Sequence, residues 1–265
     1  GEIVTKALIG LEVYDGKDRG MGTTRVVAVK ANGAKPVFRV VLKNGACVEA
    51  TGDHLVYALD KRRTPGTWRR VDELTPGMRL LLSTRTAVVK QAGELEASEA
   101  TLVGGLQGDG FVGQYEHGTN RSLTLEFMTI DKGEFQYVLD RVQQVFEGIH
   151  YHIRSVETRT PGLDVRRIRL YGEVLRPFVE KYGLLRRSAE HVVPSAIWTA
   201  GIQAQAAYLR ALFQADGTVR LRRRERPLRK ADIVLTTTSQ PLAQGIQSLL
   251  LNLGIYSRIL RGVEK

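Results

Sequence analysis

Leu-Val-Gly-Gly-Leu-Gln-Gly-Asp-Gly at residues 102–110 and Leu-Arg-Ala-Leu-Phe-Gln-Ala-Asp-Gly at residues 209–217 are two versions of one nine-residue pattern. Each version combines apolar residues at helical spacing with an Asp-Gly ending. Residues 146–149, Phe-Glu-Gly-Ile, and 252–255, Asn-Leu-Gly-Ile, recur at almost the same offset. Two matches that keep their register over a whole unit indicate an internal duplication rather than two unrelated amphipathic helices.

Small residues recur four positions apart in both copies, as Gly104 and Gly108 in the first and as Ala211 and Ala215 in the second. Positions four apart share one helix face, and small residues there let two backbones approach closely. If these faces pack on each other, Asp109 and Asp216 leave the same end of the helix pair. The pattern therefore predicts two adjacent carboxylates beside a local twofold axis.

Two carboxylates in close proximity resist joint ionisation, and a divalent cation between them removes this repulsion. Hard oxygen ligands suit Mg²⁺, which activates water and neutralises charge on a phosphodiester. An Asp-Gly pair that only ends a helix is the simpler interpretation, and it would be preferred for a single copy. Because the copies are in register, we expect Asp109 and Asp216 to form a catalytic metal site.

The first 90 or so residues are typical of β-structure. Asn-Gly at residues 32–33 and 44–45 separates strand-like runs, and two such turns in succession predict an antiparallel meander. Cys47 lies in one of these runs, where we expect a small core residue. Residues 90–98 are polar and suit a linker; beyond them, helical and strand-like runs mix, which predicts an α+β domain.

The net charge of +11 is concentrated in the second half of the chain and favours a polyanionic partner, most commonly nucleic acid. A single cysteine excludes a disulfide framework and a cysteine-built zinc site. No stretch has the layout of a signal peptide or reaches bilayer length, so we expect no membrane partner and a cytoplasmic location.

The two motifs, together with residues 192–198 (Val-Val-Pro-Ser-Ala-Ile-Trp) and 249–255 (Leu-Leu-Leu-Asn-Leu-Gly-Ile), resemble the LAGLIDADG homing endonuclease family in its intein-borne form. The resemblance covers roughly residues 95–265. It implies a monomer of two pseudo-symmetric αββαββα repeats, about 98–190 and about 199–265, that cuts double-stranded DNA at a long target site.

The same resemblance implies that Asp109 and Asp216 bind Mg²⁺, with Mn²⁺ or Ca²⁺ as other possible occupants, and that carbonyls of Gly108 and Ala215 add ligands. The family also places a basic residue, usually a lysine, near each cleavage centre. Three basic residues are candidates in the first half: Lys181, Arg186 and Arg187.

Basic residues in two regions are the candidates for DNA contact. The run at residues 165–169 has mixed spacing that serves both groove and phosphate contacts, and residues 220–230 hold seven basic residues against one acid. A solvated loop is the simpler interpretation of the second region. The predicted DNA-binding residues are Arg154, Arg159, Arg166, Arg167, Arg169, Arg220, Arg222, Arg223, Arg224, Arg226, Arg229 and Lys230.

Residues 1–94 resemble the Hint fold of inteins, on the stretch Thr51-Gly52-Asp53-His54, in which the Thr and His would activate a scissile peptide. The chain departs from that pattern because residue 1 is Gly and residues 262–265 lack the terminal His-Asn. We therefore expect no splicing by this chain, with Thr51, Asp53 and His54 vestigial. The second repeat also stops early: either a further segment of the same precursor completes it, or its ending is abbreviated.

Two other functions remain open from sequence. One is a splicing element whose endonuclease is inactive, and the other is a maturase-like protein that binds DNA or RNA without cutting. Retention of both aspartates argues against the latter. Mg²⁺-dependent linearisation of a plasmid, lost when either aspartate becomes asparagine, would distinguish cleavage from binding alone.

Overall fold

A computed structural model describes residues 12–15, 22–30, 33–59, 66–82, 94–114, 122–158, 162–222 and 230–262. The chain divides into two compact units. Unit 1 comprises residues 1–88 and 250–265, and unit 2 comprises residues 89–249. The tail after residue 249 is thus grouped with the amino-terminal unit, whereas the sequence suggested that it closes the second repeat.

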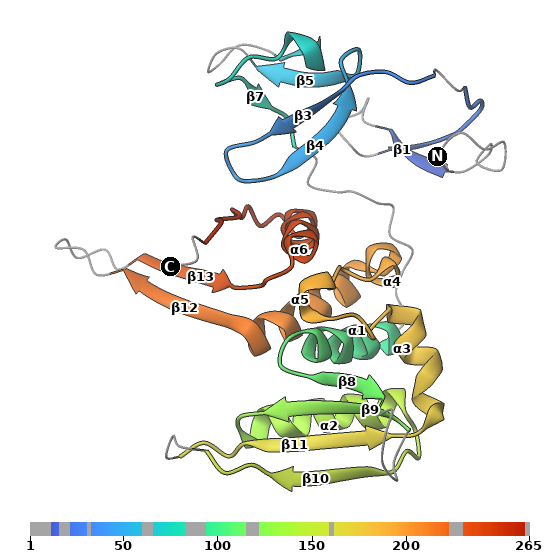
Figure 1. The fold of residues 1–265 in the computed structure, drawn as a ribbon, viewed down its shortest axis with the longest axis vertical. Coiled ribbons are helices and arrows are strands. Elements are labelled where there is room, and N and C mark those ends of the chain that lie inside the picture. The colour runs from blue at the N-terminus through green and yellow to red at the C-terminus, as the bar shows by residue number, and fades with distance from the viewer. Residues whose placement is uncertain are drawn as a thin grey trace. The chain divides into compact units, whose positions relative to one another are not determined.

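Unit 1 is built from short antiparallel strands (Figure 1). They form two two-stranded sheets, β1-β2 and β3-β4, and a three-stranded sheet in the order β6-β5-β7. The strands are β1 (Glu12–Asp15), β2 (Gly22–Arg25), β3 (Val37–Val41), β4 (Cys47–Thr51), β5 (Leu55–Leu59), β6 (Thr67–Arg70) and β7 (Arg79–Leu80), with a 3-10 turn at Val71–Glu73.

The predicted meander is half right. Asn44-Gly45 makes the expected turn between β3 and β4, with Gly45 at a φ of 86° and its N–H donating to the Leu42 carbonyl at 2.9 Å. Asn32 lies outside the described residues, and β2 and β3 belong to separate two-stranded sheets, in which β2 pairs with β1 and β3 pairs with β4. Cys47 is exposed, so its assignment to the core was wrong.

The tail is tied to unit 1 at this same turn. The N–H of Ile259 donates to the carbonyl of Asn44 at 2.9 Å, and a Cβ added at Gly45 would lie 2.9 Å from the Ile259 Cβ. Between residues 253 and 262, all of which the structure describes, no strand or helix follows the last helix.

Unit 2 begins with one complete helix–strand–strand–helix–strand–strand–helix series. Its elements are α1 (Glu94–Gln107), β8 (Phe111–Gln114), β9 (Leu123–Thr129), α2 (Lys132–Val145), β10 (Tyr151–Ser155), β11 (Arg166–Tyr171), a 3-10 turn at Glu173–Leu175 and α3 (Arg176–Tyr182). After a 3-10 turn at Ser188–Glu190 and α4 (Ser195–Thr199), the series restarts with α5 (Ile202–Asp216), β12 (Gly217–Arg222), β13 (Lys230–Leu235) and α6 (Gln240–Asn252).

The strands of the first series form one antiparallel sheet in the order β10-β11-β9-β8, and β12 pairs with β13 as a separate hairpin. Alternate residues of β9 and β11, including Leu125, Phe127, Ile168 and Leu170, are fully or almost fully buried on one face. Because α2 packs against β9 and buries its own apolar face, this side of the sheet forms the core.

Local signals explain where the helices begin and end. Asp131 caps α2 by accepting the Glu134 N–H at 2.8 Å, while the Glu134 carboxylate accepts the Ile130 N–H at 2.7 Å. Gly183 ends α3 in a left-handed conformation, with a φ of 59°. Among the described residues, no helix combines the length and apolar character needed to cross a membrane.

Candidate functional site

The two motif helices, α1 and α5, pack directly on each other in unit 2 (Figure 1). A Cβ added at Gly104 would lie 2.3 Å from the Tyr208 carbonyl oxygen, and one at Gly108 would lie 2.4 Å from the Ala215 Cβ. These distances leave no space for a side chain, so the close approach of the helices depends on glycine. The predicted packing of the small-residue faces is confirmed.

The two motif acids lie at the same end of this helix pair. Asp216 is the last residue of α5 and is half-buried, while Asp109 lies just beyond the end of α1 and is exposed. Burial raises the pKa of the Asp216 carboxyl, the negative charge of Asp109 raises that pKa further, and His191 opposes both effects. The two carboxylates therefore repel each other electrostatically.

The donor set at this end of the helices suits a hard divalent cation. No described Lys or Arg forms an ion pair with either acid, and His191 only partly offsets the effect of Asp109 on Asp216. In the described part of the chain, no three His, Cys, Asp or Glu side chains are grouped to hold a metal. Two carboxylates with water, backbone or phosphate oxygens as the other ligands match the coordination of Mg²⁺.

Gly108 and Ala215 each directly precede a motif acid. The N–H of Gly108 donates to the Gly104 carbonyl at 3.1 Å, so Gly108 still follows the helical path of α1. Ala215 lies within the last turn of α5. Both residues are therefore at the paired helix ends, where their carbonyl oxygens remain candidate ligands.

His191 is a neighbour of Asp216 that sequence reasoning missed. It lies between the 3-10 turn at 188–190 and α4, and its Nε2 is 3.1 Å from the Arg186 carbonyl oxygen. The motif spacing gives no signal for it, because the segment that carries it returns to the helix ends only in the tertiary fold. Arg186 and Arg187 are exposed and lead into this segment.

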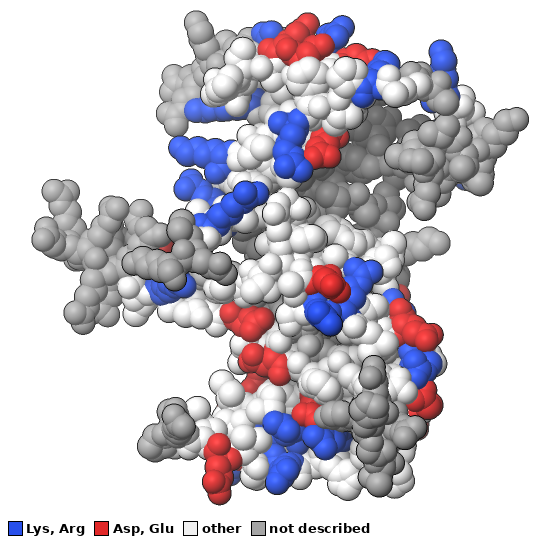
Figure 2. Space-filling model, in the orientation of Figure 1, with Lys and Arg blue, Asp and Glu red and all other residues white. Residues whose placement is uncertain are grey.

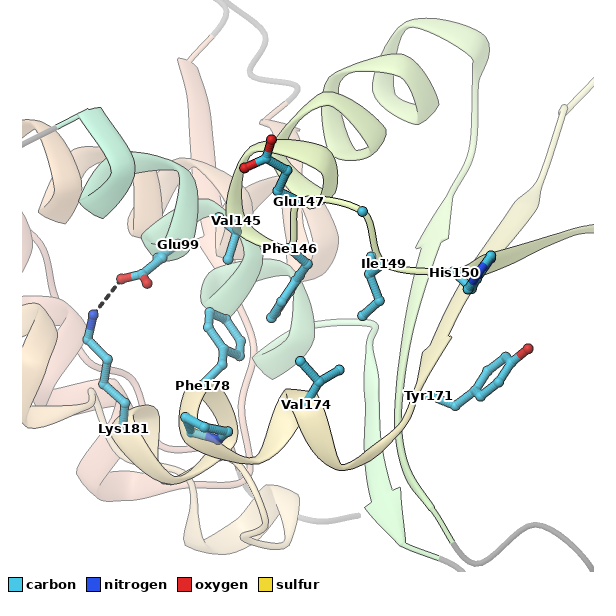
Figure 3. Close-up of a pocket in the computed structure, with 12 residues that line it drawn as sticks. Glu99, Val145, Phe146, Glu147, Ile149, His150, Tyr171, Val174, Phe178 and Lys181 are labelled. Atoms are coloured by element: carbon cyan, nitrogen blue, oxygen red, sulfur yellow. Dashed lines mark hydrogen bonds and ion pairs between the residues drawn. The ribbon is translucent and has the colours of Figure 1, made fainter.

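The structure does not bring Lys181 to the motif acids. Its Nζ donates to Glu99 of α1 at 2.6 Å, beside a cavity of about 700 Å³ that is also lined by Phe146 and Phe178 (Figure 3). Glu99 lies eight residues before the end of α1, about 12 Å along the helix. Lys181 is thus separated from the motif ends.

The basic residues of β10 and β11 divide between the two faces of the sheet. Arg167 and Arg169 alternate with the buried Ile168 and face away from the core, and Arg154 pairs with Arg167 across the strands. Figure 2 shows Lys and Arg side chains over this region together with acidic ones. Both Arg167 and Arg169 form ion pairs with Glu126 of β9, whose side chain is 9% exposed.

Arg166, which the sequence grouped with the other candidate DNA-binding arginines, lies on the opposite face. Its guanidinium group lies 4.8 Å from the ring centroid of Phe135 in α2 and forms an ion pair with Asp164 at 2.8 Å. These contacts hold it on the helix-covered side of the sheet. The alternation of the strand, which the mixed spacing of residues 165–169 obscured, separates it from Arg167.

The second basic region is only partly described. Arg220 is exposed on β12, and Arg222 is the cross-strand partner of Lys230 at the last pair of the β12–β13 ladder. The remaining predicted DNA-binding residues lie outside the described residues: Arg159, Arg223, Arg224, Arg226 and Arg229.

In unit 1, Thr51, Asp53 and His54 surround the end of β4. Asp53 forms an ion pair with Lys35, and hydrogen bonds from Lys35 and Thr51 lower the pKa of Asp53 to about 2. The His54 side chain is exposed, and its backbone N–H donates to the Thr51 carbonyl at 3.0 Å. Asp53 and His54 are exposed and Thr51 is half-buried, and their vestigial splicing role stays a prediction.

Several proteins match this chain along most of its length. DnaB, a replicative DNA helicase of Rhodothermus marinus, is 31% identical over 240 residues, covering 89% of this chain and 24% of the helicase. The alpha chain of the NrdEB ribonucleoside-diphosphate reductase of Bacillus subtilis is 28% identical over 250 residues, covering 90% and 22%. The DNA gyrase A protein of Mycobacterium gordonae is 26% identical over 235 residues, covering 87% and 40%. The chain thus spans less than half the length of each of these relatives.

Solved structures of homing endonucleases align with part of this chain. I-DmoI, in complex with its target DNA in the presence of Mg, aligns with a TM-score of 0.42 and 13% identity over 61% of this chain and 80% of that chain. I-WcaI, bound to its DNA recognition sequence, aligns with a TM-score of 0.32 and 12% identity over 48% and 53%. Because both TM-scores are low, these structures do not assign the chain to a family, and the assignment depends on the sequence match. Residues 203–265 match the LAGLIDADG-like domain, and the chain therefore carries a LAGLIDADG-like domain that includes the second motif.

Proposed function

We propose that this protein is a site-specific double-strand DNA endonuclease, derived from an intein, in which Asp109 and Asp216 jointly hold Mg²⁺. The observation that carries the proposal is the close contact between the small-residue faces of α1 and α5, which brings both acids to one end of the helix pair. Mn²⁺ or Ca²⁺ would fit the same oxygen ligands.

When bound, the divalent cation supplies Lewis-acid stabilisation of phosphodiester charge and lowers the pKa of water. The chain contributes two carboxylates related by the internal repeat, one for each DNA strand. Their repulsion, expressed in the raised pKa of Asp216, makes the site more favourable with a cation than without one.

The comparisons support the intein origin. A helicase, a reductase and a gyrase carry out unrelated reactions, yet each matches the same 235–250 residues while most of its length lies outside the match. A segment shared in this way is best explained as an insert common to the three. Thr51 and His54 on unit 1 fit the remnant of a splicing domain.

DNA would lie along the core-distant face of the sheet, where Arg154, Arg167 and Arg169 gather. Strands suit the major groove, and the rim of this face supplies cations for phosphates. Glu126 pairs two of these arginines and keeps their guanidinium groups oriented before DNA arrives. The exposed Arg220 of β12 would give the second repeat its own basic contact.

The test is a supercoiled plasmid carrying the uninterrupted form of the gene into which this chain is inserted. With Mg²⁺ the wild-type protein should linearise the plasmid, and Asp109→Asn or Asp216→Asn should abolish linearisation. Asp140→Asn makes the same chemical change on α2, away from the motif ends, and should cut like the wild type. A wild type that leaves the plasmid intact, or motif variants as active as Asp140→Asn, would contradict the proposal.

A further inference from the structure

Gln107 is a buried polar residue at the end of α1, two positions before Asp109. Its side-chain oxygen accepts a hydrogen bond from the hydroxyl of Tyr208 in α5 at 2.6 Å, and its amide donates to the Val192 carbonyl at 3.0 Å. Tyr208 is fully buried and Gln107 is 7% exposed. One side chain thus connects both motif helices to the segment that follows His191.

That segment is fixed from its other side as well. The hydroxyl of Ser239, which is fully buried, donates to the His191 carbonyl at 2.6 Å and accepts the N–H of Leu242 at the start of α6. Val193 packs so closely against α6 that a Cβ added at Gly245 would lie 2.6 Å from its Cγ2. The backbone around His191 therefore has a defined position relative to α1, α5 and α6.

The internal repeat shows that this connection exists on one side only. The counterpart of Gln107 in the second motif is Gln214, which is exposed. The counterpart of Tyr208 is Thr101, whose hydroxyl donates to the Ala97 carbonyl within its own helix at 2.9 Å. The motifs are related by duplication, but their surroundings are not equivalent.

The surroundings of the two motif acids are not equivalent either. Asp216 is half-buried and has His191 as an electrostatic neighbour, whereas Asp109 is exposed. Because a backbone carbonyl only accepts hydrogen bonds, the contact with the Arg186 carbonyl requires a hydrogen on Nε2 of His191. In the neutral ring, Nδ1 then keeps its lone pair, so the tautomer is fixed by the same segment.

We infer that Gln107 is a positioning residue that holds the His191–Val192 segment beside Asp216 and so makes the two cleavage centres unequal. The inference rests on the proposed endonuclease function. Loss of the Gln107 link should displace the imidazole and slow the strand cut that depends on Asp216, while the cut that depends on Asp109 is retained. The cut that depends on Asp216 would therefore require the Gln107 link, whereas the cut that depends on Asp109 would not.

The first test follows His191 directly, without DNA or metal. The chain has five histidines, so selective ¹⁵N labelling gives few imidazole signals, and a His191→Gln spectrum assigns the relevant one. Wild type should show the Nε2-protonated tautomer, and Gln107→Leu should shift or broaden this signal. Gln205→Leu is the matched control. Gln205 of α5 is buried, as Gln107 of α1 is, but its amide donates to the Ala200 carbonyl and not to the Val192 carbonyl. An unchanged His191 signal in Gln107→Leu would overturn the inference.

The second test measures the two strand cuts separately on an end-labelled target duplex with Mg²⁺. Gln107→Leu should slow one strand by about 10-fold or more relative to the other, the usual range for supporting residues at a metal site. Tyr208→Phe removes only the hydroxyl that holds Gln107 and should change the ratio in the same direction, even if Gln107→Leu fails to fold. Gln205→Leu should leave the ratio unchanged.

A general loss of stability would slow both strands together and leave their ratio unaltered. A wild-type ratio in both Gln107→Leu and Tyr208→Phe, with the wild type cutting both strands, would overturn the inference and leave the endonuclease function standing. A wild type that cuts neither strand would overturn the endonuclease function itself, and the imidazole spectra would still decide whether Gln107 positions His191.

Discussion

Gly104 and Gly105 are neighbours in α1, but only Gly104 faces α5. A Cβ at Gly104 would lie 2.3 Å from a backbone oxygen, whereas a Cβ at Gly105 would meet only the Phe127 ring at 3.9 Å. The helix contact therefore depends on one of two adjacent glycines. A pattern of small residues four apart selects the same glycine from sequence, since Gly108 lies one turn further along the face.

Gly104→Ala should lower the free energy of unfolding of unit 2 by about 1–3 kcal/mol, because the helices must separate to admit the methyl group. Gly105→Ala should be neutral or stabilising by up to about 1 kcal/mol, since alanine restricts the unfolded chain and fits here. Urea denaturation followed by circular dichroism measures both. Equal effects of the two substitutions would contradict the close helix contact.

The raised pKa of Asp216 predicts how stability depends on pH in the metal-free protein. Its folded-state pKa is above the unfolded value near 3.9, so the folded state binds the extra proton, and stability falls as pH rises through this window. Asp216→Asn removes the titration and should gain stability over the wild type as pH rises from about 4 towards 7. Parallel pH profiles of urea denaturation for the two proteins would contradict the electrostatic coupling.

The acids and the small residues were predictable because they recur in sequence at one spacing. His191 was not, because it is brought to Asp216 by packing of the 191–193 segment against α6, a long-range contact without a periodic signal. The position of Lys181 was not predictable for the same reason. Its partner is Glu99, in the part of α1 that is distant from the motif acids.

In unit 2, the sequence pattern predicted the helices and strands but not which face of a strand each arginine occupies. The mixture of helical and strand-like runs expected from sequence is present as β9, α2 and β11. The face of each arginine did not follow from sequence, because residues 165–169 contain two adjacent arginines and the register with β9 decides which one is covered. In unit 1, the sequence likewise did not predict that β2 pairs with β1.

This division of faces leads to a prediction about DNA binding. Arg154→Ala should reduce the dependence of log Kd on log salt by about 0.9 for each phosphate that the protein no longer neutralises, because fewer counterions are released. Arg166→Ala removes the same charge from the opposite face, where the guanidinium contacts Phe135 and Asp164, and should leave the salt slope unchanged. Fluorescence anisotropy across a salt series measures both slopes. A larger slope change in Arg166→Ala would place DNA on the opposite face.

At the scale of the molecule, the end of the described chain belongs with its beginning. The bond from Ile259 to Asn44 ties residues 250–262 to unit 1, although the repeat in the sequence placed them in unit 2. The repeat was informative as far as α6, where the two series still correspond. Beyond that point the tail contacts a turn more than 200 residues earlier, and such a contact has no local sequence signature.

Ile259→Pro should loosen unit 1 alone, because proline removes the N–H that Asn44 accepts and a hydrogen bond of this kind contributes about 0.5–1.5 kcal/mol. Hydrogen exchange should speed up around β3 and β4 and stay unchanged in α1 and α5. Faster exchange throughout unit 2 would show that the tail supports unit 2 instead.

We propose that the two motif acids share a divalent cation, and Mn²⁺ titration of protein labelled with ¹³C at the Asp carboxyl carbons can show whether they do. Paramagnetic broadening should reach Asp109 and Asp216 at the same low Mn²⁺ concentration, and substitution of either acid by asparagine should protect the other. Broadening of only one of them, or no change in one when the other is replaced, would show that the acids do not act as one site.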